Sequence, residues 1–213
     1  MKSTLLIKTL SGLLLVSALG ACAPLMFAGV AGTAMVASDR RTSGAQLEDE
    51  AIELRAQARI RDNLGERAHV NVTSFNRQVL ITGEVSAEKD RQGVLQLVER
   101  IENVKSVVNE LSVMPFSTLS ERSNDLLITA KVKASYVDSK DLFANAFKVV
   151  TERGTVYVMG RVTQREANSA THLTRNVGGV NKVVRLFEII TEDELRNLLP
   201  PPAPSSDTAK PVK

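Results

Sequence analysis

The thiol of Cys22 is the side chain in this sequence best suited to covalent chemistry. It belongs to the only cysteine among 213 residues, so it has no disulfide partner within the chain. It follows a short apolar run, residues 10–19, which is itself preceded by Lys2 and Lys8. A charged start and a short apolar core are typical of a secretory signal, and the core is too short for a membrane-spanning helix of about 20 residues.

The residues that end this segment, Leu19-Gly20-Ala21-Cys22, resemble the bacterial lipobox. The resemblance implies that the thiol receives a diacylglycerol, that the chain is cut before Cys22 and that the new amino terminus is acylated. Ala23 stands where an aspartate favours retention at the inner membrane, so we expect delivery to the outer membrane. The alternative is an ordinary signal peptide followed by a chance cysteine, which would leave a secreted protein with an unpaired thiol.

The other nucleophiles and metal-ligating residues form no recognisable catalytic pattern. His69 and His172 have no metal-motif spacing such as HExxH, and no second cysteine is present to join them. Ser117, Ser120 and Ser123 lack the glycines of a nucleophile elbow. We therefore expect no catalytic residues, no metal and no cofactor. Nucleic acid is not an expected partner, because secretion would separate it from the chain and basic residues are not interleaved with aromatic ones.

The body of the chain contains two copies of one pattern. The segment VLITGEVSAE, which begins at Val79, matches VYVMGRVTQR, which begins at Val156. Downstream, VERIENVKSVVNELSV matches LTRNVGGVNKVVRLFEI, and upstream ARIRDNL matches AKVKASY. Three matched blocks in the same order indicate a duplication.

Hydrophobic periodicity predicts the same elements in both copies, in the order α-β-β-α-β. In the first copy a helix begins near Glu48, a turn at Asn76-Arg77 joins two strands, and Ser86 caps a second helix. In the second copy we expect helices over 124–137 and 164–176, and strands over 147–151, 155–162 and 182–190. The expected fold class is α+β, with two tandem domains that each pack two helices on one face of a small mixed sheet.

These patterns predict six parts along the chain. They are a lipoprotein signal peptide (1–21), a lipidated linker (22–47), a first domain (48–114), a linker (115–122), a second domain (123–191), and a short helix with a disordered proline-rich tail (192–213). Each copy of about 60 residues is near the lower limit for independent folding. Because no disulfide can form, aliphatic cores must stabilise both.

Gly83 and Gly160 occupy the same position in the two copies, at the centre of a predicted strand. Glycine is unfavourable inside a strand unless another part of the structure comes very close. We therefore expect that a helix crosses the sheet at these two structural glycines.

The repeated unit resembles the BON domain, named after bacterial OsmY and nodulation proteins. The resemblance rests on the glycine-centred strands 79–85 and 156–162 and on the closing segments 103–111 and 178–184. A lipobox, the segment DRRTSGAQLED and two such domains together resemble the dual BON-domain outer-membrane lipoproteins, described as division- and outer-membrane stress-associated lipid-binding proteins. The resemblance implies anchorage in the inner leaflet of the outer membrane, facing the periplasm, a role in envelope integrity and cell division, and binding of anionic phospholipid through the second domain.

The two copies differ in charge in a way that agrees with this expectation. Residues 48–113 contain 9 basic and 12 acidic residues, whereas residues 121–191 contain 11 basic and 7 acidic ones. The positive second copy would be attracted to anionic headgroups such as those of phosphatidylglycerol and cardiolipin. The expected lipid-binding residues, on the first helix of that copy, are Leu126, Leu127, Lys131, Lys133 and Ala134.

Family members often carry a tryptophan in the first turn of this helix, where the present sequence has Leu127. The helix therefore lacks the usual aromatic anchor at a membrane interface. Two functions remain open from the sequence. One is a lipid-binding module, and the other is a protein adaptor that binds outer-membrane assembly or cell-wall remodelling machinery.

Overall fold

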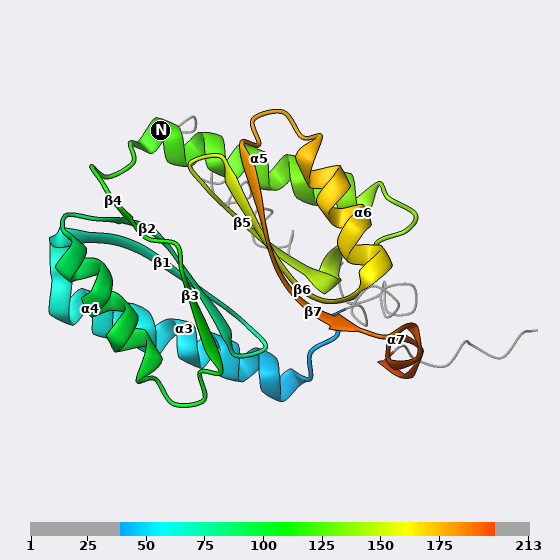
Figure 1. The fold of residues 1–213 in the computed structure, drawn as a ribbon, viewed down its shortest axis with the longest axis horizontal. Helices are drawn as coiled ribbons and strands as arrows, with labels where there is room; N and C mark the ends of the chain where they lie inside the picture. Colours follow the sequence, from blue (N-terminus) through cyan, green and yellow to red (C-terminus); the bar gives the residue numbers. More distant parts are fainter. Residues whose placement is uncertain (1–38, 199–213) are drawn as a thin grey trace, which may run out of the picture. The chain divides into compact units, whose positions relative to one another are not determined.

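Each copy of the repeat folds as two helices on one face of a small sheet (Figure 1). The structure is a computed structural model and describes residues 39–198. The expected signal peptide, Cys22 and the proline-rich tail lie outside the described residues. Within the described residues the fold is α+β, as the periodicity predicts.

The first domain is built around one central strand. Its elements are α3 (Ser43–Leu64), η3 (Gly65–Arg67), β1 (Ala68–Phe75), β2 (Gln78–Val85), α4 (Glu88–Glu99), β3 (Ser106–Asn109) and β4 (Ser112–Val113). The strand β2 pairs antiparallel with β1 and parallel with both β3 and β4. The predicted hairpin and mixed sheet are therefore confirmed.

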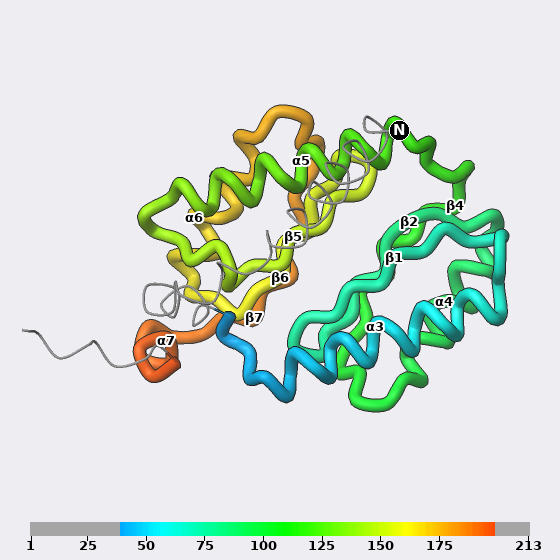
Figure 2. The backbone as a smooth tube through the Cα atoms, turned by 180° about the vertical axis from the view of Figure 1, so that it is seen from behind, coloured from blue at the N-terminus to red at the C-terminus, as the bar shows by residue number. Residues whose placement is uncertain are grey.

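The second domain repeats this plan, with one uninterrupted last strand. Its elements are α5 (Leu119–Val137), η4 (Ala144–Ala146), β5 (Phe147–Glu152), β6 (Thr155–Thr163), α6 (Gln164–Arg175) and β7 (Lys182–Ile190), and α7 (Glu192–Leu198) follows it. The central strand β6 pairs antiparallel with β5 and parallel with β7. Figure 2, seen from behind, shows α5 and α6 on the same side of this sheet.

The first helix of each domain begins about five residues earlier than predicted, because a threonine caps it. The hydroxyl of Thr42 accepts a hydrogen bond from the backbone N–H of Ala45 at the start of α3. At the start of α5, Thr118 and Glu121 form a capping box in which each side chain accepts a hydrogen bond from the other's backbone N–H. Such caps satisfy donors that the first helical turn leaves unpaired.

Two local predictions for the first domain are wrong. Ser86 does not cap α4, because its hydroxyl donates instead to the carbonyl oxygen of Arg67, and the helix begins after Ala87 without a side-chain cap. The last strand is also interrupted between β3 and β4. There, the side-chain oxygen of Asn109 accepts a hydrogen bond from the N–H of Leu111 and so replaces a ladder bond.

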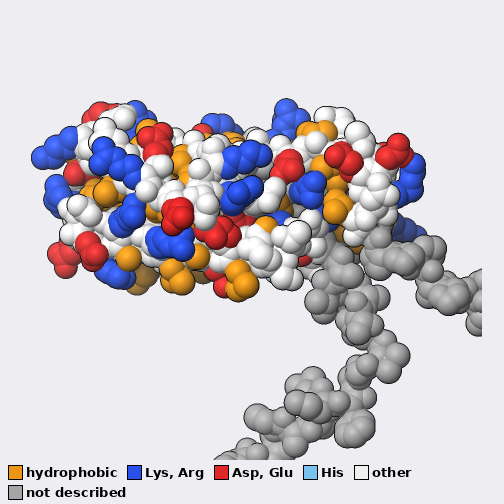
Figure 3. Space-filling view, turned by 90° about the horizontal axis from the view of Figure 1, so that it is seen from below, with side chains coloured by type: hydrophobic (Ala, Val, Ile, Leu, Met, Phe, Trp, Pro, Cys, Tyr) orange, Lys and Arg blue, Asp and Glu red, His pale blue; other side chains and the backbone are white. Residues whose placement is uncertain are grey.

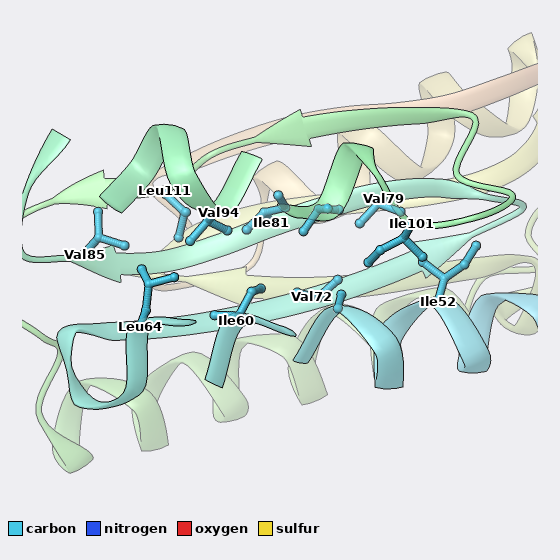
Figure 4. Packing of buried hydrophobic residues seen from close by; sticks show 12 residues of the cluster. Ile52, Ile60, Leu64, Val72, Val79, Ile81, Val85, Val94, Ile101 and Leu111 are labelled. Carbon is cyan, nitrogen blue, oxygen red and sulfur yellow. The ribbon is translucent and has the colours of Figure 1, made fainter. Parts of the chain in front are cut away.

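The core of each domain lies between its two helices and its sheet. Figure 4 shows side chains from both helices of the first domain meeting those of the strands. The buried aliphatic positions of α3 are Ile52, Ala56, Ile60 and Leu64, and the buried core positions of α5 are Ile128, Val132 and Tyr136. In the structure Ile60 is equivalent to Tyr136, whereas the sequence match of ARIRDNL with AKVKASY pairs Ile60 with Val132, four residues earlier. A shift of four residues is about one helical turn and keeps the same face, so helical periodicity alone cannot fix the register.

A buried aspartate from the first helix of each domain holds the hairpin turn. The carboxylate of Asp49 accepts hydrogen bonds from both backbone N–H groups of Asn76-Arg77, at 2.7 and 2.8 Å. The carboxylate of Asp125 accepts the same pair of bonds from Arg153-Gly154, at 2.7 and 2.9 Å. All four turn residues have positive φ, which is costly for side chains other than glycine. The aspartates therefore stabilise a strained turn that each sheet requires.

The glycines Gly83 and Gly160 are needed for contact with neighbouring backbone, and the predicted approach of a helix is wrong. A Cβ on Gly83 would lie 2.1 Å from the carbonyl oxygen of His69 on the paired strand, and the residue has φ of +112°. A Cβ on Gly160 would lie 2.8 Å from the carbonyl oxygen of Ala146. The obstructing atom belongs to the strand β1 for Gly83, and for Gly160 it belongs to the last residue of the short 3-10 helix η4, which leads into β5.

We expect Asp49→Ala to lower the free energy of unfolding by about 2–4 kcal/mol, because it leaves two partly buried backbone donors and the buried hydroxyl of Ser74 without their acceptor. Urea unfolding followed by circular dichroism measures this change. The control is Asp62→Ala, at an exposed position of the same helix. A loss for Asp49→Ala that equals the control would contradict the role of this carboxylate.

We expect Gly83→Ala to lower the free energy of unfolding by about 3 kcal/mol or more, because the added methyl group overlaps a carbonyl oxygen at a positive φ. Gly93→Ala on α4 is the control, since its Cβ would meet open space. Alanine there should stabilise the helix by about 0.5–1 kcal/mol. Thermal unfolding of the two variants must therefore shift in opposite directions, and a common direction would refute the explanation.

Candidate functional site

The outward surface of α5 carries an apolar stripe on a helix whose opposite side is the core. Its exposed apolar side chains include Leu119, Leu126, Leu127 and Val137, which are 81%, 71%, 60% and 71% exposed. At about 100° per residue, these four positions with Ala130 and Ala134 fall within an arc of about 100°. A helix that buries one face normally has polar residues on the other, so this exposed apolar stripe indicates a surface that binds a partner.

Two lysines border the stripe. Lys131 lies about 40° beyond Leu127 on one side, and Lys133 lies about 20° beyond Leu126 on the other. Both lysines are exposed, and neither forms an ion pair with a carboxylate in residues 39–198. The five residues predicted as lipid-binding, Ala134 among them, therefore lie on one exposed face of one helix. Lysines in this position can extend their ammonium groups toward anionic headgroups while their stems cover apolar surface.

The linker before α5 adds apolar surface that the sequence analysis missed. Val113, Met114 and Phe116 are 45%, 40% and 39% exposed. Together with Ser86 and Pro115 they line a shallow cavity of about 440 Å³. The signal for this surface is the run of apolar residues in a connection between domains, where polar residues are usual.

Charge is mixed on the surface that Figure 3 shows, which is the molecule seen from below relative to Figure 1. Lys and Arg side chains there are interspersed with Asp and Glu, and hydrophobic side chains form only small separate groups. Among the described residues this face therefore carries no large contiguous apolar patch.

The two sheets also bury side chains on the faces that carry no helices. Phe75 and Leu80 of the first domain form one buried cluster with Tyr157 and Met159 of the second. Partly buried side chains that pack against this cluster are Val108, Val150, Val184 and Leu186. The signal in the sequence is the unbroken apolar run in β2 and β6, because a strand with one face in water alternates apolar and polar residues.

Charged contacts surround this cluster. Arg153 of the second domain donates to Glu84 of the first at 2.7 Å, and Lys148 forms an ion pair with Glu53 at 2.8 Å. Burial opposes the ionisation of Glu84, but hydrogen bonds from His69 and Arg153 outweigh it and lower the pKa of this carboxyl. Glu84 is therefore an ionised, fully buried carboxylate between the domains.

The segment before the first domain contacts the second domain through Arg40. Its guanidinium group makes two hydrogen bonds of 2.7 Å to the carboxylate of Glu166 and a third to the carbonyl oxygen of Arg161. Burial opposes the ionisation of Glu166, and Arg40 is the main group that lowers the pKa of this carboxyl in spite of it. The neighbouring Arg41 turns the other way and pairs with Asp49 of α3. Two consecutive arginines thus attach one linker to both domains.

In residues 39–198 no helix combines the length and the apolar character that a membrane span requires.

Comparison with known proteins identifies the family of these two domains. The BON domain family model matches residues 48–115 and 124–191. The outer membrane lipoprotein DolP of Haemophilus influenzae is 33% identical over 172 residues, covering 79% of this chain and 89% of that protein. The 21 kDa hemolysin of Actinobacillus pleuropneumoniae is 29% identical over 154 residues, covering 71% of this chain and 79% of that protein. Neither name is that of an enzyme. The chain therefore belongs to the family of dual BON-domain outer-membrane lipoproteins.

Proposed function

We propose that this protein is anchored by acylated Cys22 in the inner leaflet of the outer membrane, faces the periplasm and binds anionic phospholipid through α5. Through this second attachment it supports outer-membrane integrity, including at the division site. The observation that carries the proposal is the exposed apolar stripe of α5 between Lys131 and Lys133.

The charges of the two domains support this orientation. The second domain has an excess of 4 positive charges over residues 121–191, whereas the first has an excess of 3 negative charges over residues 48–113. Each basic residue near an anionic surface contributes about 1 kcal/mol. The second domain would therefore be attracted and the first repelled, which favours contact through α5.

Each side chain of α5 contributes a modest free energy of membrane binding, and the acyl anchor makes their sum sufficient for the helix to stay bound. Two lysines contribute about 2 kcal/mol, and partial burial of each leucine of the stripe contributes about 1 kcal/mol or more. Such a helix alone would bind weakly and reversibly. An acyl anchor on the same chain raises the local concentration of the helix at the bilayer, so that weak contacts become occupied.

A second candidate function is that of a protein adaptor for outer-membrane assembly or cell-wall remodelling machinery. The cavity of about 440 Å³ beside Val113, Met114 and Phe116 favours it, because apolar side chains around a shallow hollow suit a peptide or loop of another protein. This surface lies on the linker and not on α5. The two functions can therefore be separated by variants of different residues.

We expect the chain from Ala23 onward, which lacks the acceptor cysteine, to float with vesicles that contain phosphatidylglycerol or cardiolipin and not with purely zwitterionic vesicles. High salt should release it, because screening weakens exposed charges. Changing Leu127→Ala and Lys131→Ala together should weaken binding about thirtyfold, equivalent to about 2 kcal/mol. Co-flotation on a density gradient measures each of these.

The control for this experiment is a matched pair on the first domain. Leu54 on α3 is 68% exposed, much like Leu127, and Arg61 on the same helix is also exposed. Changing Leu54→Ala and Arg61→Ala should leave flotation unchanged. Equal loss for both pairs, or no flotation of the unmodified chain with anionic vesicles, would favour the adaptor function.

We expect Cys22→Ser to abolish metabolic labelling of the protein with palmitate and to move it from the membrane fraction to the soluble fraction. The reason is that the hydroxyl of serine is not a substrate for thioether formation with diacylglycerol. Ser17→Ala, within the preceding apolar run, is the control and should keep both the label and the location. Retention of label by Cys22→Ser would disprove anchorage at this residue.

A further inference from the structure

Three metal-ligating side chains from three strands meet where the two BON domains touch. They are His69 of β1, Glu84 of β2 and Glu152 of β5, and one potential ligand atom from each lies within 4.8 Å of those of the other two. The imidazole Nδ1 of His69 is 2.8 Å from Oε2 of Glu84. Two of the residues come from the first domain and one from the second, so anything bound by all three would join the domains.

This region has more negative than positive charge. Four carboxylates gather there, from Glu84, Glu152, Asp125 and Glu121, against the guanidinium groups of Arg122 and Arg153. The carboxylate of Glu152 receives a hydrogen bond from the neutral amide of Asn71 at 3.2 Å, and in the described residues it makes no ion pair. A bound cation would offset this excess of negative charge.

The cluster is accessible from outside. His69 and Glu152 line a cavity of about 190 Å³ together with Asn71, Thr151, Arg122 and Leu126. Its volume is large enough for a hydrated ion to enter, because a water molecule occupies about 30 Å³ of liquid. The side chain of Glu84 is fully buried at the base of the cluster, whereas that of His69 is 22% exposed.

We propose that His69, Glu84 and Glu152 bind a divalent transition-metal ion, with zinc as the best match, and that the ion fixes the two BON domains to each other. An imidazole nitrogen and two carboxylate oxygens are a ligand set that zinc accepts, with water in the fourth position. None of the three ligands belongs to the stripe on α5, although Leu126 of that stripe borders the cavity. The metal site therefore holds whether that stripe binds lipid or protein.

Metal binding requires the three ligand atoms, which lie within 4.8 Å of one another, to adjust their positions. At Zn–N and Zn–O distances of about 2.0–2.1 Å, tetrahedral ligand atoms are about 3.3 Å apart. The contact of 2.8 Å between Nδ1 of His69 and Oε2 of Glu84 must therefore widen by about 0.5 Å as the metal replaces the proton between them. Arg153 remains on Oε1 of Glu84 at 2.7 Å, where it orients the carboxylate in the manner of outer-shell partners of metal ligands.

Zinc binding to the full chain, purified in a nonionic detergent and treated with EDTA, tests the proposal. Isothermal titration should give one zinc ion per chain with a dissociation constant of about 10 µM or below. Glu152→Gln keeps the shape of the side chain and removes its charge, so it should weaken binding about tenfold or more. His172→Gln, at an exposed position of α6, is the matched control and should bind zinc as the unmodified chain does.

Two further measurements test the site, and the first of them needs no variant. Cobalt(II) added to the unmodified chain should give an intense visible absorption typical of four-coordinate sites, and zinc should displace it. Saturating zinc should also raise the melting temperature of the unmodified chain but not that of Glu152→Gln. Absence of zinc binding, or binding by Glu152→Gln equal to that of the unmodified chain, would overturn the proposal and leave the three residues as a hydrogen-bonded charge cluster only.

Discussion

The packing of the two sheets against each other determines which surfaces of this protein are exposed. Each small sheet has helices on one face only, so its other face needs a partner to exclude water. Leu80 and Met159, both fully buried, show that each domain provides that partner for the other. A domain of about 60 residues buries little apolar surface by itself, and a second copy increases it. Because the sheets use their bare faces for each other, the helices remain outside, and α5 is free to present its stripe.

Duplication has preserved the interior of the two copies and changed their surfaces. Asp49 and Asp125 hold equivalent turns with equivalent hydrogen bonds, and buried positions recur with the same spacing in both first helices. The outer faces differ, since one copy is acidic and the other basic. This difference between interior and surface is expected. A buried carboxylate that loses its hydrogen-bond donors lowers the stability of the fold, whereas an exposed charge can change sign with little effect on stability.

Secondary structure and fold class followed from the sequence because they depend on local periodicity. The strand over 182–190 and the hairpin turn at Asn76-Arg77 were predicted correctly for this reason. Contacts between distant residues were not predicted. The ion pair of Arg40 with Glu166 joins residues 126 apart, and no local pattern indicates it. The contact between the sheets is indicated by the apolar runs of β2 and β6. A prediction that assumes only one buried face for each sheet misses this signal.

The attachment of Arg40 to Glu166 also sets a limit on distance. Between Cys22 and Arg40 the chain has 18 residue steps, which span at most about 60 Å when fully extended. If Cys22 is held at the bilayer as proposed, the domains can explore only a layer of that depth. Breaking the ion pair of Arg40 would extend this reach very little, because Arg41 is held by Asp49 one residue further on, so the two arginines together mark where the folded body begins.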